Sequence, residues 1–297
     1  MTFRDGVRLD PSRIQRRGAG TGSGGMAVGG GIGALVLLIV GAFFGVDLSG
    51  LGLGGSHGST VTANDPNLQA QLEQKCTDAQ AANSDPQCLV VGTINSLDAY
   101  WSTAAPAAGA SSFTFPGVVM FDSVTDTPCG TASSQTGPFY CPNDQTIYID
   151  TTFFDVLVQQ YGSSAGPLAQ EYVVAHEYGH HIQNLLGIFD KADLSGTGAN
   201  SDSVKVELMA DCLAGVWANH AATGPSAFLN PLSKQDVSDA LQAARSVGDD
   251  RIQEATQGQA NPDTFTHGTS QQRVDSFLSG YNGGTVKGCD TFGVVTQ

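Results

Sequence analysis

The sequence predicts an α+β domain that is mainly helical, with a small β-sheet, placed after a single N-terminal transmembrane helix. Three observations predict this class. Residues 26–46 carry no charged side chain and are long enough to cross a bilayer as one helix. Beyond them, apolar residues recur at helical spacing, as at Val237, Leu241 and Ala244. Short stretches that alternate apolar and polar residues, of which 146–150 is the clearest, predict a few strands.

Composition divides the chain into four parts. We expect a basic cytoplasmic arm at 1–25, the spanning helix at 26–46, a Gly- and Ser-rich linker at 47–66, and one domain at 67–297. The positive-inside rule keeps an arginine-rich arm in the cytoplasm, so the domain would be a single-pass, extracytoplasmic part of a cell-membrane protein. A cleaved signal peptide is the alternative, although the apolar stretch is long and no Ala-x-Ala pattern follows it. The arginines of the arm are Arg4, Arg8, Arg13, Arg16 and Arg17.

Within the domain, the pattern predicts an order of elements. The turn Asn83-Ser84-Asp85-Pro86 separates the first two helices, and Cys141-Pro142-Asn143-Asp144 precedes the clearest strand. Strands are expected at 111–122 and 146–150. Helices are expected at 67–82, 88–104, 152–161, 167–186, 204–222 and 233–257, with a last one from about residue 270.

The motif with the clearest chemistry is the run of residues 176–180, which reads His-Glu-Tyr-Gly-His. Positions i and i+4 share one face of a helix, so His176 and His180 can direct their rings at one metal ion. Glu177 can then act as general base toward a zinc-activated water. The alternative is a pair of surface histidines on a solvated helix, but the apolar residues on both sides of the motif favour a buried one.

A catalytic zinc site needs a third protein ligand and an open fourth position. The segment 204–217 reads as a second helix with Glu207 and Asp211 on one face. We expect Glu207 to supply the ligand and Asp211 to orient a ligating histidine. The alternative is a solvated acidic stripe. However, the rest of this helix is largely apolar, and two acids on a mostly buried helix need a cation.

At this point four blocks of sequence resemble one family. They are residues 137–150, 176–184, 207–217 and 265–273, in that order along the chain. Together they are similar to the putative neutral zinc metallopeptidase family over about residues 67–289. The resemblance implies a zincin-like, largely helical fold with bound Zn²⁺ and a membrane-anchored or exported protein; it implies no particular substrate. Tyr178 stands where a small or aliphatic residue is expected.

Two further residues are candidate donors for a transition-state oxyanion. Tyr148 lies in the predicted strand 146–150, which could bind substrate backbone as an edge strand or could be a core strand. His267 lies just before the last helix and is alternatively a capping or packing residue.

The cysteines agree with an exported domain. All six lie beyond residue 46, and no Cys-x-x-Cys pattern is present, so disulfides in an oxidising compartment are the simpler account. By spacing, Cys76 pairs with Cys88 and Cys129 with Cys141, which leaves Cys212 for Cys289. The sequence alone leaves the connectivity open, and free thiols are the alternative. The six positions are Cys76, Cys88, Cys129, Cys141, Cys212 and Cys289.

These residues together predict a membrane-anchored, extracytoplasmic zinc metallopeptidase, a hydrolase that acts on a peptide or protein substrate. The formal net charge of −15 argues against a nucleic-acid partner. Two alternatives stay open. One is a non-catalytic, zinc-holding cell-envelope binding or scaffold protein, which has no need of Glu177. The other is a zinc amidase acting on cell-wall peptides, which would share the same site.

Overall fold

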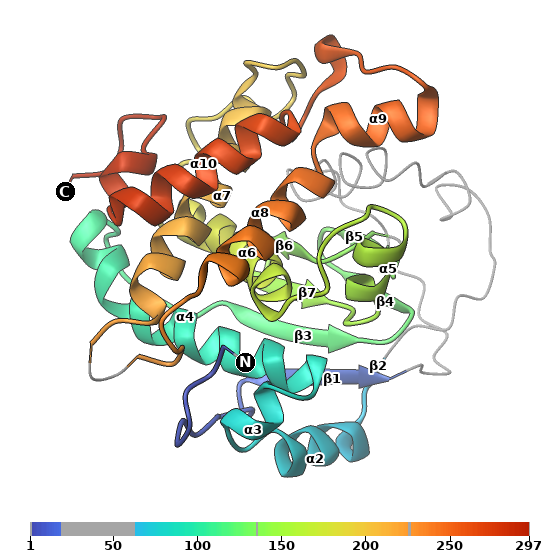
Figure 1. Ribbon diagram of the computed structural model, residues 1–297, viewed down its shortest axis with the longest axis vertical. Helices are drawn as coiled ribbons and strands as arrows, with labels where there is room; N and C mark the ends of the chain where they lie inside the picture. Colours follow the sequence, from blue (N-terminus) through green and yellow to red (C-terminus); the bar gives the residue numbers. More distant parts are fainter. Residues whose placement is uncertain (1, 19–62, 135, 225–226, 297) are drawn as a thin grey trace.

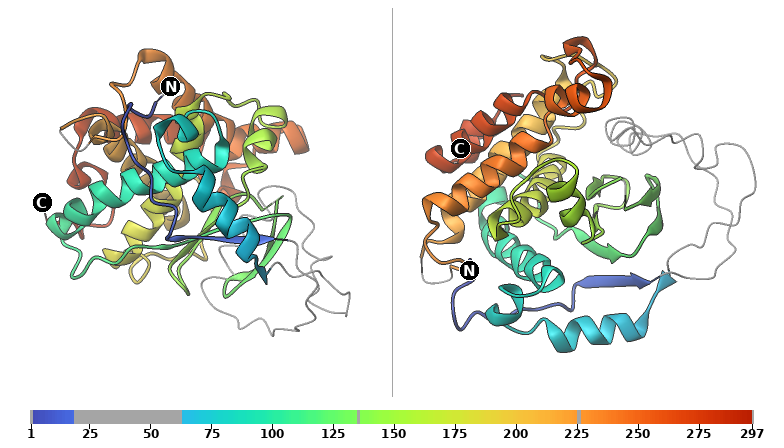
Figure 2. Two further views of the ribbon diagram at one scale, coloured as in Figure 1. Left: turned by 90° about the horizontal axis from the view of Figure 1, so that it is seen from below. Right: turned by 45° about the vertical axis from the view of Figure 1, so that its right-hand side comes forward.

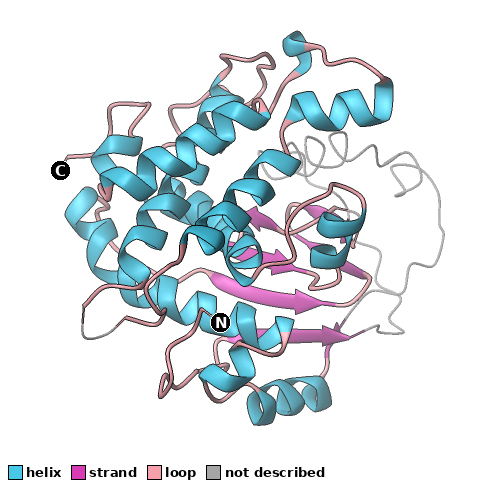
Figure 3. Cartoon of the chain, viewed as in Figure 1, coloured by secondary structure: helices cyan, strands magenta, loops and turns pink. Residues whose placement is uncertain are grey.

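The computed structural model describes residues 2–18, 63–134, 136–224 and 227–296 (Figure 1). The described part is mainly helical, and its strands lie together in one region of the molecule (Figure 3). The α-helices are α2 (Pro66–Lys75), α3 (Ala79–Ala82), α4 (Pro86–Ala108), α5 (Phe153–Gln159), α6 (Pro167–Leu185), α7 (Asp202–Ala221), α8 (Lys234–Ser246), α9 (Asp249–Gln257) and α10 (Ser270–Gly283). Two short 3₁₀ helices are η2 (Pro262–Thr264) and η3 (Val286–Cys289). The strands are β1 (Ile14–Gly18), β2 (Ala63–Asn64), β3 (Gly117–Phe121), β4 (Val124–Thr127), β5 (Gly130–Ser133), β6 (Phe139–Cys141) and β7 (Thr146–Ile149).

Five strands form a mixed sheet in the order β2-β1-β3-β7-β6. The three central strands β1, β3 and β7 run parallel to one another, and the edge strands β2 and β6 run antiparallel to them. Alternate residues of one strand face opposite sides, so Ile147 and Ile149 pack into the main helical core. Tyr148 packs on the other side, in a smaller cluster that includes Cys129 and Ala132 of the β4–β5 region. Both faces of β7 are therefore buried.

Helix α6 occupies the centre of the helical layer and contacts α4, α7, α8 and β6 (Figure 1). Glycines permit the closest approaches among these helices. A Cβ atom at Gly179 of α6 would lie 3.1 Å from the carbonyl oxygen of Ala210 in α7. A Cβ atom at Gly280 of α10 would lie 1.9 Å from the carbonyl oxygen of Cys212, so α10 also packs backbone to backbone on α7. These contacts fix α7 between α6 and α10.

Residues 2–18 belong to this domain, which corrects the predicted topology. β1 pairs with β3 over four residues, from Ile14 with Val118 to Arg17 with Phe121. It also pairs with β2 on its other side, where Gly18 lies opposite Ala63. An arm on one side of a membrane cannot share a sheet with a domain on the other side. The predicted fold, in which a single transmembrane helix separates an N-terminal arm from the domain, is therefore wrong.

The predicted spanning helix itself, residues 26–46, lies outside the described residues. Within the described ranges, no helix has both the length and the apolar character needed to cross a bilayer. The mainly helical class with small sheets holds, whereas the fold prediction with an N-terminal transmembrane helix does not.

The arginines of the predicted arm have structural partners in the domain. Arg13 forms an ion pair with Asp98 of α4, and Arg16 binds Asp122 with a shortest distance of 3.0 Å. Arg17 donates to the Thr125 hydroxyl at 3.0 Å, and its guanidinium carbon lies 5.6 Å from the centre of the Tyr148 ring. Figure 2 shows the N-terminal segment (blue) running beside the cyan helices into the sheet. The charged side chains of Arg13, Arg16 and Arg17 therefore bind partners within the domain.

Tyr178, the residue that departs from the family pattern, takes part in the same network. Its hydroxyl donates to Asp98 at 2.9 Å, on the carboxylate that also binds Arg13. Helix α6 is thus linked through α4 to the N-terminal segment.

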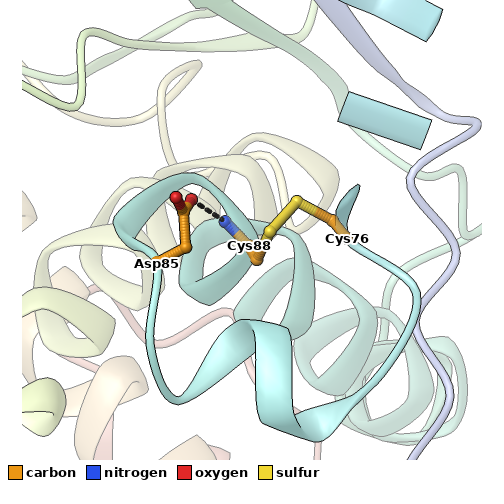
Figure 4. Close-up of side chains that lie close together, drawn as sticks. All are labelled: Cys76, Asp85 and Cys88. Carbon is orange, nitrogen blue, oxygen red and sulfur yellow. Dashed lines mark hydrogen bonds between the residues drawn. A yellow bond between two sulfur atoms is a disulfide. The ribbon is translucent and has the colours of Figure 1, made fainter. Parts of the chain in front are cut away.

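Three disulfides join the pairs that spacing predicted: Cys76–Cys88, Cys129–Cys141 and Cys212–Cys289. Figure 4 shows the first of these beside Asp85, whose carboxylate accepts the backbone N–H of Cys88 at 3.2 Å and caps α4. The three side chains lie close enough to be considered as metal ligands, but the two sulfur atoms are bonded to each other. These three residues therefore cap the start of α4 and link it to the preceding segment, and the bonded sulfur atoms are not available to a metal.

The position of β1 in the sheet generates a prediction. Replacing Ile14, which is 1% exposed, by Asp should destabilise the protein by about 3–5 kcal/mol because an unpaired carboxylate would enter the core. Gln15→Asp, one residue further along the same strand on its exposed face, should change stability little. Chemical denaturation of the full-length variants measures both effects, and equal stability of the two would contradict the placement of this strand.

Candidate metal centre

Helices α6 and α7 bring together the three predicted metal ligands. His176 Nε2 lies 3.1 Å from one Glu207 carboxylate oxygen, and His180 Nε2 lies 3.5 Å from the other. Tetrahedral zinc with ligands at 2.0–2.1 Å separates its ligand atoms by about 3.3 Å, so this arrangement fits the ion. Among the described residues, this group holds no fourth His, Cys, Asp or Glu. Three protein ligands leave a coordination position for water or substrate.

Asp211 holds His176 in the orientation that a ligand requires. Its carboxylate lies 2.8 Å from His176 Nδ1, so Nδ1 is the donor and Nε2 faces Glu207. Asp211 is fully buried, and two hydrogen bonds from Arg273 of α10, at 2.9 and 3.0 Å, compensate its charge. The Tyr172 hydroxyl also donates to it. The contact with His176 is the one that the predicted role of Asp211 requires, and the role itself stays a prediction.

His180 has an equivalent support that the sequence analysis missed. The side-chain oxygen of Gln183 lies 2.8 Å from His180 Nδ1, and its amide donates to the Val206 carbonyl of α7 at 2.6 Å. Gln183 is completely buried. The available signal was a polar residue three positions after a ligand on an apolar helix face.

Glu177 faces the same pocket as the three ligands. It is 8% exposed, and it lines one cavity together with His176, His180, Glu207 and His267. Burial raises the pKa of Glu177 to about 8, against the opposing effect of the nearby His176 and of the Tyr140 backbone N–H. A carboxyl group whose pKa lies near neutrality can both take and return a proton, which is the property of a general base that later acts as an acid.

His267 lines the same pocket and lies in the loop between η2 and α10. Asp249, which the sequence analysis did not single out, anchors this loop. One of its carboxylate oxygens accepts the backbone N–H groups of Thr266, His267 and Gly268 at 2.7–2.9 Å. The other lies 3.6 Å from His267 Nδ1, and the Thr266 hydroxyl lies 2.9 Å from the same nitrogen. These contacts direct the Nε2 side of the ring away from Asp249.

The structure does not bring Tyr148 to this group. Its side chain lies on the opposite face of the sheet from α6, where its hydroxyl donates to Asp144 at 2.7 Å and its ring stacks on Phe139. The strand that carries it, β7, has neighbours on both sides. The edge strand at the pocket is β6, whose residues Phe139 and Tyr140 contribute to the lining.

The two histidines differ in their proton affinity. Burial favours the neutral form of both, and it lowers the pKa of His180 to about 4. At His176, the charge and hydrogen bond of Asp211, together with the hydrogen bond to Glu207, outweigh burial and raise the pKa to about 10. The same histidines hold the pKa of Glu207 well below its usual range, against the effect of its burial. Two imidazoles and a carboxylate anion form a donor set suited to zinc.

Comparison with known proteins agrees with this site. The model of a family described as putative neutral zinc metallopeptidase matches residues 2–292, nearly the whole chain, so the protein belongs to that family. Membership implies a zinc-binding protein of the metallopeptidase class.

Two relatives are similar over most of their length. Rv2575 of Mycobacterium tuberculosis H37Rv is 51% identical over 223 residues, which is 73% of this chain and 74% of the relative. YpfJ of Escherichia coli K12 is 37% identical over 299 residues, which is 98% of this chain and 97% of the relative. Both are described as uncharacterized proteins, and no solved structure matches the chain.

The raised pKa of His176 predicts that zinc affinity depends on pH. A proton on His176 is favoured below about pH 10, and it must leave before the imidazole can bind zinc. Affinity should therefore rise with pH, about tenfold per unit between pH 6 and 8. Competition with a chelator at several pH values measures this. A constant affinity over that range would contradict the coupling between Asp211 and His176.

Proposed function

We propose that the protein is a zinc-dependent peptidase that hydrolyses peptide bonds, with Glu177 as general base. The observation that carries the proposal is the buried Glu177 carboxyl group in the same pocket as three, rather than four, protein ligands. A structural zinc site is closed by a fourth ligand and needs no adjacent acid. The alternative of a non-catalytic scaffold leaves both features without a role.

His176, His180 and Glu207 would hold the zinc ion, which would supply Lewis-acid chemistry for the scissile carbonyl group and the attacking water. Glu177 accepts the proton of that water and passes it to the leaving amine. His267, held by Asp249, donates a hydrogen bond to the oxygen that becomes negative in the transition state. Asp211 and Gln183 keep the ligand rings in place and exchange no proton with the substrate.

The edge strand β6 supports a peptide as the substrate. Its backbone N–H at Tyr140 points to Glu177, so the outer edge of the strand faces the pocket. An extended peptide can pair with such an edge through backbone hydrogen bonds, largely independently of sequence. Pro138 and Pro142 flank the strand and limit this edge to a few residues.

The three disulfides support an extracytoplasmic location for the domain. Such bonds persist in oxidising compartments and are rare in the cytosol. One of them, Cys212–Cys289, begins at the residue after Asp211, so an oxidised state is built into the helix that carries the third ligand.

The experiment that tests this function compares the zinc-loaded full-length protein with Glu177→Gln on a diverse peptide library. We expect hydrolysis by the parent protein and a loss of at least about 10³-fold in the variant, because the base is removed while the ligands stay. Zinc content, measured by mass spectrometry, should be equal in both. Glu254→Gln, on the exposed face of α9, is the matched control.

No hydrolysis of any peptide by the zinc-loaded parent protein would overturn the proposal. Activity on cell-wall peptides alone would instead favour the amidase alternative.

His267 has its own expected outcome. His267→Ala should lower kcat by about 10²–10³-fold and leave zinc content unchanged, since the side chain acts on the transition state and not on the metal. His220→Ala is the control, because His220 lies at the end of α7 and bonds the Gly284 carbonyl outside the pocket. Loss of zinc in His267→Ala would assign His267 to metal binding.

A further inference from the structure

The pocket around the metal centre has two apolar walls. The first consists of Phe153 and Leu157 of α5, Val173 of α6 and Val247 at the end of α8. The second consists of Phe189 and Leu194, in the loop after α6, and Val206 of α7. Both belong to the same continuous cavity as the three ligands and Glu177.

One residue of each wall can be placed along the axis of α6, and these two residues lie on opposite sides of the ligands. Val173 precedes His176 by three residues, so it lies about 4.5 Å toward the start of the helix. Phe189 follows the end of α6, and its ring centre lies 6.5 Å from that of His180. Val206 is the residue before Glu207. A peptide whose scissile bond lies at Glu177 therefore meets one wall on each side of that bond.

The polar side chains in the lining are engaged with protein partners. Arg273 is bound to Asp211, the Tyr172 hydroxyl and the Val247 carbonyl. The Ser203 hydroxyl is directed at the carbonyls of Leu194 and Gly196, at 3.1 and 2.8 Å. Thr266 contacts His267. A charged substrate side chain would lose its hydration in either half of the pocket without gaining a partner of opposite charge.

From these observations we infer that the site selects peptides with a large apolar side chain on each side of the bond that is cut. The inference rests on the proposed peptidase function and adds the class of substrate. Leucine-, isoleucine-, methionine- or phenylalanine-sized side chains match walls made of Phe, Leu and Val. Charged side chains are rejected by desolvation rather than by a repelling charge.

The first test uses the unmodified full-length protein and a peptide series in which the two residues flanking the scissile bond vary independently. We expect kcat/KM to fall at least about tenfold when Leu is replaced by Ala at either position, and further with Asp or Lys. Equal rates for Leu, Ala, Asp and Lys at both positions would overturn the inference while leaving the peptidase function intact.

The second test assigns each wall to one substrate position. Val173→Asp and Leu194→Asp each place a carboxylate in one wall, at side chains that are only partly buried. Each should lower kcat/KM at least about tenfold for substrates with Leu at one flanking position, and the two variants should affect different positions. Val158→Asp, on α5 but outside the lining, is the matched control. An effect of both variants on the same position would contradict two separate walls.

A third measurement is independent of turnover. Calorimetry of the zinc-loaded protein with two hydroxamates, one bearing an isobutyl and one a carboxymethyl side chain, should give at least tenfold tighter binding of the isobutyl compound. If the isobutyl compound binds more tightly but no peptide is hydrolysed, the inference of an apolar pocket is supported and the proposed peptidase function is overturned. Equal affinity for the two compounds would overturn the inference that the pocket selects apolar side chains.

Discussion

The buried carboxylate of Asp211 is the constraint on which the arrangement of the site depends. A fully buried anion is stable only when its charge and lone pairs are satisfied, and here α6 and α10 supply the partners. His176 and Tyr172 come from α6, whereas Arg273 comes from α10. The same contact that neutralises Asp211 therefore joins three helices and turns His176 toward Glu207. The orientation of His176 and the packing of the three helices therefore both follow from the need to compensate the buried charge of Asp211.

Glycine determines how closely the three helices can approach to meet this requirement. Gly179 lets the ligand helix lie against Ala210, one residue before Asp211, and Gly280 brings α10 onto Cys212, one residue after it. Asp211 is thus flanked by two close helix contacts, one with α6 and one with α10. His176 and His180 can both lie close to Glu207 of α7 because Gly179, which lies between them on the side of α6 that faces α7, lets the two helices approach closely.

The sequence predicted the parts of the site that local chemistry determines. Two histidines one turn apart and two acids on an apolar helix are unusual enough to indicate a metal, and the six cysteines suggested the three observed pairs. The sequence analysis missed Asp249 and Gln183 because a single polar residue forms no pattern. Only the folded chain shows that Asp249 holds the His267 loop and that Gln183 holds His180. The sequence left residues 146–150 open as an edge strand or a core strand, because alternation of apolar and polar residues does not show how many neighbours a strand has. The structure places this strand between β3 and β6, so Tyr148 lies away from the site.

The N-terminal prediction failed for a related reason. Arginines before an apolar stretch match the pattern of a membrane anchor, and the sequence does not show that Asp98, Asp122 and Thr125 bind three of them. Parallel pairing between residues about a hundred positions apart has no local signature. The family match, which begins at residue 2, agrees that this segment is part of the conserved unit.

The placement of β1 also affects the order in which the protein can fold. During synthesis at about 5–20 residues per second, β1 emerges about a hundred residues before its partner β3, so the edge of β1 that pairs with β3 stays open for roughly 5–20 s. The antiparallel pair of β1 and β2 can form earlier, but the sheet is completed only by the non-local, parallel pairing of β1 with β3. Until β3 has been made, the open edge of β1 is exposed to aggregation.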